Sequence, residues 1–232
     1  METPSPAGSR APKPPAVGSG ARPLRLGVVA DTHCPEFLAE LPDRLLEGLA
    51  GVDLIIHCGD VGGPGGEATL AALARLAPVK AVRGDHDRAL GGLPPSLLLN
   101  WGGIRIAVAH GNRTRLIEEP VTLIGSLTLG LLWPRPASAP WLRARFPGAD
   151  LIVYGHTHRA AIERRGAQVV LNPGAVYVVT AEAAHARLQR HPNWFERAWL
   201  QVIRHRRDRP RASFALVEVS PGGIECQIVG LD

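Results

Sequence analysis

The sequence has few cysteines and no long apolar run. Its three cysteines, Cys34, Cys58 and Cys226, do not make a disulfide framework, and small buried thiols are a simpler interpretation of Cys34 and Cys58 than soft metal ligands. No segment reaches the roughly 18 to 20 apolar residues of a membrane-spanning helix. The N-terminus lacks the apolar centre of a secretory signal. These absences favour a cytoplasmic enzyme.

Lysine is also scarce, so arginine supplies most of the positive charge in a chain with a net charge of +5. A basic balance can indicate a nucleic-acid or membrane partner, but the excess here lies in local stretches and says little about the core. Residues 1–23 are rich in proline, glycine, serine and alanine and have almost nothing apolar to bury. They are expected to form a disordered tail, or less simply a basic docking arm, before one folded domain over residues 24–232.

Short apolar runs that end in aspartate or histidine recur along the chain. The first four begin about 25 to 30 residues apart, which is roughly the length of one strand–helix–strand unit. Parallel strands place their carboxyl ends at one edge of a sheet, so we expect the polar side chains after these runs to converge. The runs are Leu26–Ala30, Asp53–His57, Val79–Arg83, Ile104–Ala109 and Leu151–Tyr154.

Other segments complete an α/β pattern. The spacing of apolar residues predicts helices over Phe37–Ala50 and Glu67–Leu76. Turn residues predict a hairpin between Ser96–Trp101 and Ile104–Ala109. Further strands are expected at Gln168–Leu171, Ser213–Val219 and Gly223–Val229, the last two forming an antiparallel edge.

The side chains that follow the strands are suited to metal binding. A mixture of imidazole and carboxylate ligands favours Mn, Fe, Zn, Co or Ni over Mg or Ca. Seven ligands are too many for one ion and about right for two, and two cations roughly 3.5 to 4 Å apart can activate water and clamp a phosphate ester. The candidate ligands are Asp31, His33, Asp60, Asp85, His110, His156 and His158.

The order of these motifs resembles that of the calcineurin-like metallophosphoesterase superfamily. The matching motifs are Asp31-Thr32-His33, Gly59-Asp60, Gly84-Asp85-His86-Asp87, His110 and Gly155-His156-Thr157-His158. Asn172-Pro173-Gly174 is similar to a motif of its small bacterial and archaeal phosphodiesterase branch. The resemblance covers about Leu24–Ala175 and the last two strands. It implies a four-layer α-β-β-α sandwich of two mixed sheets flanked by helices, with a dinuclear metal site at the carboxyl edge of the strands.

The resemblance also implies roles for individual residues. Asp60 would bridge two divalent ions, with Mn²⁺ the expected metal; Asp31, His33 and His158 would complete one site, and Asp85, His110 and His156 the other. His86 would donate a proton to the leaving alkoxide or steady the phosphate, with Asp87 orienting it. A surface or supporting role is the alternative for His86. His57 lies inside a strand and is predicted to be a packed core residue.

One ligand departs from the family pattern. The family has asparagine where this chain has Asp85, and the extra carboxylate brings the ligand charge closer to that of two divalent ions. We therefore expect a weaker attraction for dianionic monoesters and a preference for monoanionic diesters. The alternative is a lineage with impaired catalysis. Ala175 replaces the family's serine, which is a minor change.

Two insertions are expected, at about residues 113–149 and 182–211. The first contains the apolar stretch Val121–Trp133, for which a core helix or hairpin is favoured over a lid or homo-oligomer patch, and over an interfacial membrane anchor. The second is rich in arginine interleaved with Trp194, Phe195 and Trp199. It is interpreted as a solvated helix face, or else as a surface that recruits a polyanion such as nucleic acid or phospholipid.

The sequence thus predicts a metallophosphoesterase that hydrolyses a phosphate-ester substrate, with phosphodiesters favoured over monoesters. Two alternatives stay open. One is a scaffold of the same fold with impaired catalysis, as in the retromer subunit that resembles these small phosphoesterases. The other is a nucleic-acid- or lipid-binding protein that uses the arginine-rich insertion.

Overall fold

The computed structural model describes residues 22–112, 138–190, 192, 194–205 and 210–232. The predicted tail lies almost wholly outside these ranges, although Arg22, at its end, pairs with Asp53. The apolar stretch Val121–Trp133 also lies outside them. None of the helices in the described ranges is long and apolar enough to cross a membrane.

Two mixed five-stranded sheets form the centre of the fold. In the first, β1 (Leu24–Val29), β2 (Leu54–His57) and β3 (Val79–Ala81) are parallel, and the antiparallel strands β9 (Ser213–Ser220) and β10 (Gly223–Gly230) extend it beside β1. In the second, β5 (Ile104–Ala109), β6 (Leu151–Val153) and β8 (Gln168–Asn172) are parallel, flanked by the antiparallel edges β4 (Ser96–Trp101) and β7 (Ala161–Arg165).

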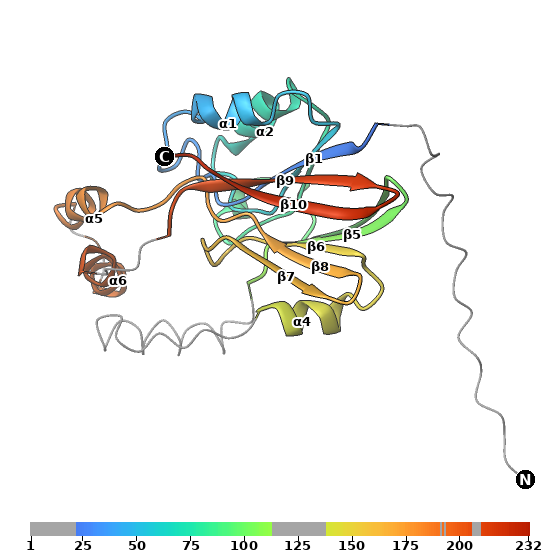
Figure 1. Cartoon of the computed structure of the whole chain (residues 1–232). Coiled ribbons are helices and arrows are strands. Elements are labelled where there is room, and N and C mark those ends of the chain that lie inside the picture. The colour runs from blue at the N-terminus through green and yellow to red at the C-terminus, as the bar shows by residue number, and fades with distance from the viewer. Residues whose placement is uncertain (1–21, 113–137, 191, 193, 206–209) are drawn as a thin grey trace, which may run out of the picture.

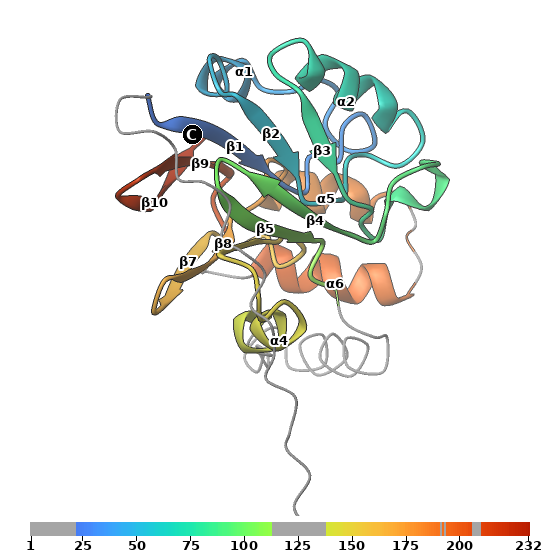
Figure 2. The ribbon, with the colours of Figure 1, turned by 90° about the vertical axis from the view of Figure 1, so that its right-hand side faces the viewer.

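Helices cover the outer faces of both sheets, which gives four layers (Figures 1 and 2). Helices α1 (Asp43–Gly48) and α2 (Gly66–Ala74) lie over the first sheet, and α4 (Ser138–Arg145) lies over the second. Helices α5 (Ala181–Leu188) and α6 (Trp194–His205) lie beyond the end of the sheets at which β1 finishes (Figure 1). The predicted α-β-β-α sandwich is therefore confirmed.

Alternating strand residues build the core. Leu26 and Val28 point into the layer between the sheets, where they join Val108 and Val153 from the second sheet. Val29 faces the opposite way and packs with residues of α1 and α2. Period-two alternation of strand side chains explains why one strand serves two apolar layers. Because both faces of the first sheet are covered by apolar layers, polar side chains can gather only at the carboxyl ends of its strands.

The first predicted helix is wrong over half its length. Helix α1 begins only at Asp43, after Pro42 in an extended conformation with φ −60° and ψ 135°. Proline disfavours helical geometry in the residue before it, so the helix cannot extend back through Leu41. The freed segment instead places Phe37 beside His33, with 5.3 Å between ring centroids.

Strand β7 was missing from the sequence-based prediction. Four of its five residues are exposed, so it has no apolar alternation to reveal it. It forms because Gly166, with φ 58°, allows a tight turn back onto β8.

Candidate metal centre

The loops after the parallel strands bring all seven predicted ligands into one cluster. Asp31 and His33 follow β1, Asp60 follows β2, and Asp85 follows β3. In the second sheet, His110 comes directly after β5, and His156 and His158 follow β6. The two sheets therefore contribute to the same end of the sandwich.

Asp60 lies close to two groups of potential ligand atoms, and it forms further groups with Asp31 and His110 and with His33 and His86. One group is Asp31, His33 and His158, and the other is Asp85, His110 and His156; within each group the ligand atoms lie within 4.8 Å of one another. Asp60 Oδ2 lies 3.8 Å from His33 Nε2 and 3.3 Å from His110 Nε2. Its Oδ1 accepts a hydrogen bond from the backbone N–H of His86 at 2.9 Å. Oδ2 is thus the atom of Asp60 that faces His33 and His110.

A hydrogen bond orients the ring of His110 so that one of its nitrogens can bind a cation. Its Nδ1 lies 2.9 Å from the carbonyl oxygen of Cys58, to which it donates. Its Nε2 is buried and has no hydrogen-bond partner. A ring that donates from one nitrogen to a carbonyl presents the other nitrogen as a ligand, which is the usual arrangement at metal sites.

The charges of the cluster point to the same conclusion. Asp31 is fully buried and Asp60 is 4% exposed, yet no lysine or arginine in the described part of the chain forms an ion pair with Asp31, Asp60 or Asp85. Burial opposes ionisation of Asp60, but its contacts with His110 and the His86 backbone hold its pKa well below the usual value. Buried anions need compensating charge, and divalent cations would supply it.

Burial also keeps one of the histidines neutral. It lowers the pKa of His33 to about 3, despite the opposing charge of Asp60. The ring therefore has a lone pair available at neutral pH. The residues present fit a pair of divalent cations in donor type and charge.

Backbone strain is concentrated at the same residues. Among the described residues, the non-glycine residues with positive φ are Asp31 (52°), His33 (46°), Asp60 (54°), His156 (67°) and His158 (54°), all of them predicted ligands. Such conformations cost energy and persist where surrounding structure enforces them, commonly at functional sites. Gly84 shows how closely the loops pack around these residues, because a Cβ there would lie 2.1 Å from Asp60 Oδ1.

Comparison with known proteins agrees with this geometry. A family model described as the calcineurin-like phosphoesterase superfamily domain matches residues 24–188. The chain belongs to this superfamily.

Two relatives of this superfamily member carry the name "Probable metallophosphoesterase". The one from the archaeon Methanothermobacter thermautotrophicus is 32% identical over 154 residues, which cover 66% of this chain and 77% of the relative. YsnB of Bacillus subtilis is 32% identical over 149 residues, which cover 64% and 73%. Among solved structures, Vps29 from Cryptosporidium parvum shares the fold, with a TM-score of 0.57 and 19% identity over 89% of this chain and 97% of that one.

His86 lies at the edge of this calcineurin-like centre, and its carboxylate partner differs from the predicted one. Glu36 places both carboxylate oxygens 3.1 Å from His86 Nδ1, and one of them 3.5 Å from His33 Nδ1. Asp87, expected to orient His86, instead accepts hydrogen bonds from the backbone N–H groups of Val61, Gly62 and Gly84. Asp87 therefore fastens the loops after β2 and β3, and Glu36 is the carboxylate in contact with His86.

Glu36 and Asn112 were missed by sequence reasoning. Asn112 donates to Asp85 Oδ1 at 2.7 Å, which leaves Asp85 Oδ2 facing His156 Nδ1 at 3.3 Å and His110 Nε2 at 3.8 Å. The sequence showed only that these two residues lie close to predicted ligands: Glu36 is three residues after His33, and Asn112 is two residues after His110. Asn172, noted in the sequence, donates to the carbonyl of Gly155 and so braces the loop of His156 and His158.

The arginine-rich helices α5 and α6 lie near the candidate centre, and one of their arginines forms an ion pair between the two helices. Arg187 of α5 stacks over the ring of Phe37 at 4.5 Å and pairs with Glu196 of α6 at 2.7 Å. Phe37 in turn contacts the rings of His33 and His86. Arg187 thus connects α5 to the Phe37 side of the candidate centre, and Glu196 connects α6 to Arg187.

His57 is buried, as predicted, and it also ties two ligand loops together. The Thr32 hydroxyl donates to the Val61 carbonyl, so His57 Nε2, at 3.0 Å from that hydroxyl, is the donor to it. His57 Nδ1 accepts from the backbone N–H of Gly59. The neutral ring therefore links the loop of Asp31 and His33 to the loop of Asp60.

The neutrality of His57 predicts a pH-dependent stability in the metal-free protein. Burial lowers the pKa of His57 to about 4, despite the charges of Asp87 and Asp60. An unfolded histidine titrates near 6.5, so between these values the unfolded state binds a proton that the folded state does not. This residue is expected to reduce the free energy of unfolding by about 1.4 kcal/mol per pH unit as pH falls from roughly 6.5 to 4.

Urea denaturation in the presence of a chelator, at pH 7 and pH 5, measures this effect. His57→Gln should lower the stability at pH 7 and weaken its dependence on pH. His185→Gln, at an exposed position of α5, is the matched control and should keep the wild-type dependence. An unchanged pH dependence in His57→Gln would contradict the assignment.

Proposed function

We propose that the protein hydrolyses phosphate esters with two divalent metal ions and acts mainly on phosphodiesters. The observation that supports this most strongly is the sharing of Asp60 Oδ2 between two groups of ligand atoms. Asp31, His33 and His158 would hold one ion, Asp85, His110 and His156 the other, with Asp60 common to both. The mixed oxygen and nitrogen donors favour Mn²⁺, and they are also compatible with Fe, Zn, Co or Ni.

The chain's own residues would then divide the work. When bound, the two ions lower the pKa of a water molecule and offset the charge of the phosphate oxygens. Asp60 and the histidines around it would bind the two ions and fix their positions. His86 would donate a proton to the leaving alkoxide, and Glu36 would hold the ring in position through its contact with Nδ1. Asp87 keeps the loop that carries His86 fixed.

Metal analysis combined with hydrolysis of bis-p-nitrophenyl phosphate tests this function. We expect the full chain to bind Mn²⁺ and to release p-nitrophenol, and a chelator to abolish the reaction until Mn²⁺ is restored. Metal binding without hydrolysis of any phosphate ester would instead support the alternative of a catalytically impaired scaffold. Retention of full activity after removal of all metal would contradict the proposal.

The diester preference is proposed from the charge of Asp85. Three carboxylates and a hydroxide balance two divalent ions, so a dianionic monoester gains less than it would beside a neutral asparagine. Asp85→Asn is therefore expected to raise the turnover of p-nitrophenyl phosphate relative to bis-p-nitrophenyl phosphate by about tenfold, the effect of roughly 1.4 kcal/mol. Asp43→Asn, an exposed carboxylate on α1, is the matched control. No rise in the ratio for Asp85→Asn would remove this explanation.

The arginine-rich helices carry a separate proposal about partners. Arg197 and Arg204 of α6 are exposed and would strengthen binding of a polyanion such as nucleic acid or phospholipid. Binding of single-stranded DNA or anionic vesicles should then weaken steeply as salt rises. Affinity that does not change with salt would favour the alternative that these arginines form a solvated helix face.

A further inference from the structure

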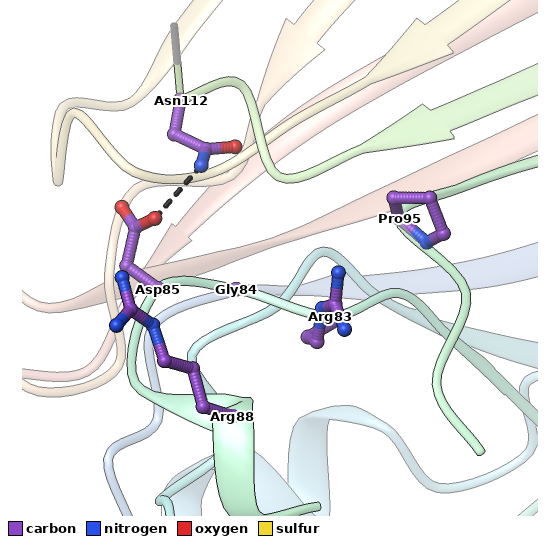
Figure 3. Close-up of a pocket in the computed structure, with 6 residues that line it drawn as sticks. All are labelled: Arg83, Gly84, Asp85, Arg88, Pro95 and Asn112. Atoms are coloured by element: carbon purple, nitrogen blue, oxygen red, sulfur yellow. Dashed lines mark hydrogen bonds between the residues drawn. The ribbon is translucent and has the colours of Figure 1, made fainter. Parts of the chain in front are cut away.

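A cleft of about 360 Å³ borders the candidate metal centre, with Asp85 in its lining. Figure 3 shows Asp85 and Asn112 joined by a hydrogen bond, with the Arg88 side chain next to Asp85 and the Arg83 side chain apart from both, toward Pro95. Oδ2 of Asp85 faces His156 and His110, and Oδ1 faces Asn112. The cleft and the metal cluster therefore share Asp85 as a wall. The lining residues are Arg83, Gly84, Asp85, Arg88, Pro95 and Asn112.

Two arginines and one carboxylate give the lining of the cleft a net positive charge. Arg83 and Arg88 are exposed, and among the described residues neither guanidinium forms a hydrogen bond or an ion pair. Asp85 is the one carboxylate in the lining, and its oxygens are turned to Asn112 and to the histidines. Two unpaired guanidinium groups are suited to an oxyanion, above all to phosphate, whose oxygens match their donor geometry.

The backbone that carries the two arginines is held in place. The N–H of Arg83 donates to the carbonyl of Pro94 at 2.8 Å. The N–H of Gly84 donates to Asp87 Oδ2 at 2.9 Å, and Asp87 begins the short helix Asp87–Ala89 that carries Arg88. The cleft is thus partly organised before a ligand arrives, which lowers the entropic cost of binding.

We propose that this cleft binds a second phosphate group of the substrate. The preferred substrate would then be a phosphodiester that also carries a terminal phosphate, with the scissile group at the metal centre and the terminal group between Arg83 and Arg88. The two positive charges match a dianionic terminal phosphate. This inference rests on the proposed function of the neighbouring centre, and it makes Arg83 and Arg88 determinants of specificity.

Calorimetric binding to the Mn²⁺-loaded full chain tests the cleft without any need for turnover. The ligands are thymidine 3′,5′-bisphosphate and thymidine 5′-phosphate, which differ only in the second phosphate. We expect the bisphosphate to bind about tenfold more tightly or better, as charged hydrogen bonds to phosphate allow. The double variant Arg83→Gln, Arg88→Gln should reduce the ratio of affinities to about twofold or less, the scale of general charge attraction.

Arg165→Gln is the matched control, since Arg165 is an exposed arginine of β7 outside the cleft lining. It should keep the wild-type ratio of affinities, and thermal denaturation should show that the double variant is folded. Equal binding of the two ligands by the wild type would overturn the inference. So would a preference for the bisphosphate that survives in the double variant.

A hydrolytic assay separates this inference from the proposed function. The substrates are the p-nitrophenyl esters of the same two nucleotides at the 5′-phosphate, with and without the 3′-phosphate. We expect a higher kcat/KM for the ester with the 3′-phosphate, and loss of this difference in the double variant. Hydrolysis of neither ester, together with a selective affinity for the bisphosphate, would contradict the proposed function and leave the phosphate cleft standing.

Discussion

Asp60→Asn is expected to lower kcat/KM for bis-p-nitrophenyl phosphate about a thousandfold, which corresponds to roughly 4 kcal/mol of transition-state stabilisation. Asp60 is the carboxylate common to both groups of ligand atoms, with Oδ2 facing His33 and His110. Asparagine has no negative charge and only one side-chain oxygen. In the wild type, Oδ1 accepts the hydrogen bond from the backbone N–H of His86 and Oδ2 faces the two histidines, and one oxygen cannot fill both positions. Either the bond to His86 or the contact with the ions would be lost.

Steady-state kinetics and metal analysis of the same preparation measure this effect. The variant should bind fewer Mn²⁺ ions per chain than the wild type as well as losing activity. Asp43→Asn has the same chemical change at an exposed position of α1 and should affect neither quantity. If Asp60→Asn kept both its metal content and activity within tenfold of the wild type, Asp60 would not be the shared ligand.

His86→Ala is expected to slow hydrolysis in proportion to how much the leaving group needs a proton. A general acid contributes about 10² to 10⁴ in rate. The loss should be of this size for thymidylyl-3′,5′-thymidine, whose leaving alkoxide is strongly basic. It should be small for bis-p-nitrophenyl phosphate, because p-nitrophenolate leaves without protonation. Kinetics on the two diesters give the comparison.

Glu36 provides the supporting test of the same role. Glu36→Gln should show a smaller loss with the same dependence on the leaving group, because Glu36 acts through His86 Nδ1. His185→Ala, on the exposed side of α5, is the control. An equal loss on both diesters in His86→Ala would assign His86 to phosphate binding, the other role that the family resemblance implies, and would contradict proton donation.

The convergence of the ligands was predictable because it depends on strand direction. Asp31, Asp60 and His110 each follow a buried apolar run, and parallel pairing places such strand ends together. The same argument predicted the edge formed by β9 and β10, since Pro221 and Gly222 mark a turn between two alternating runs.

The details that depend on loop shape were not predictable in this way. Nothing in the spacing of Glu36 shows that it would turn toward His86, because its position follows from the turn at 34–37, well before helix α1 begins at Asp43. Asp87 looked like the natural partner of its neighbour His86, but its side chain faces the backbone of Val61 and Gly84. Strand β7 carries too little apolar character to be seen before the partner strand is known.

Anomalous diffraction from crystals grown with Mn²⁺ would show whether Asp60 joins two metal ions. We expect two Mn²⁺ peaks roughly 3.5 to 4 Å apart, on either side of Asp60 Oδ2, with His33 beside one and His110 beside the other. A single peak that Asp60 does not touch, or no peak within reach of these side chains at saturating Mn²⁺, would contradict it.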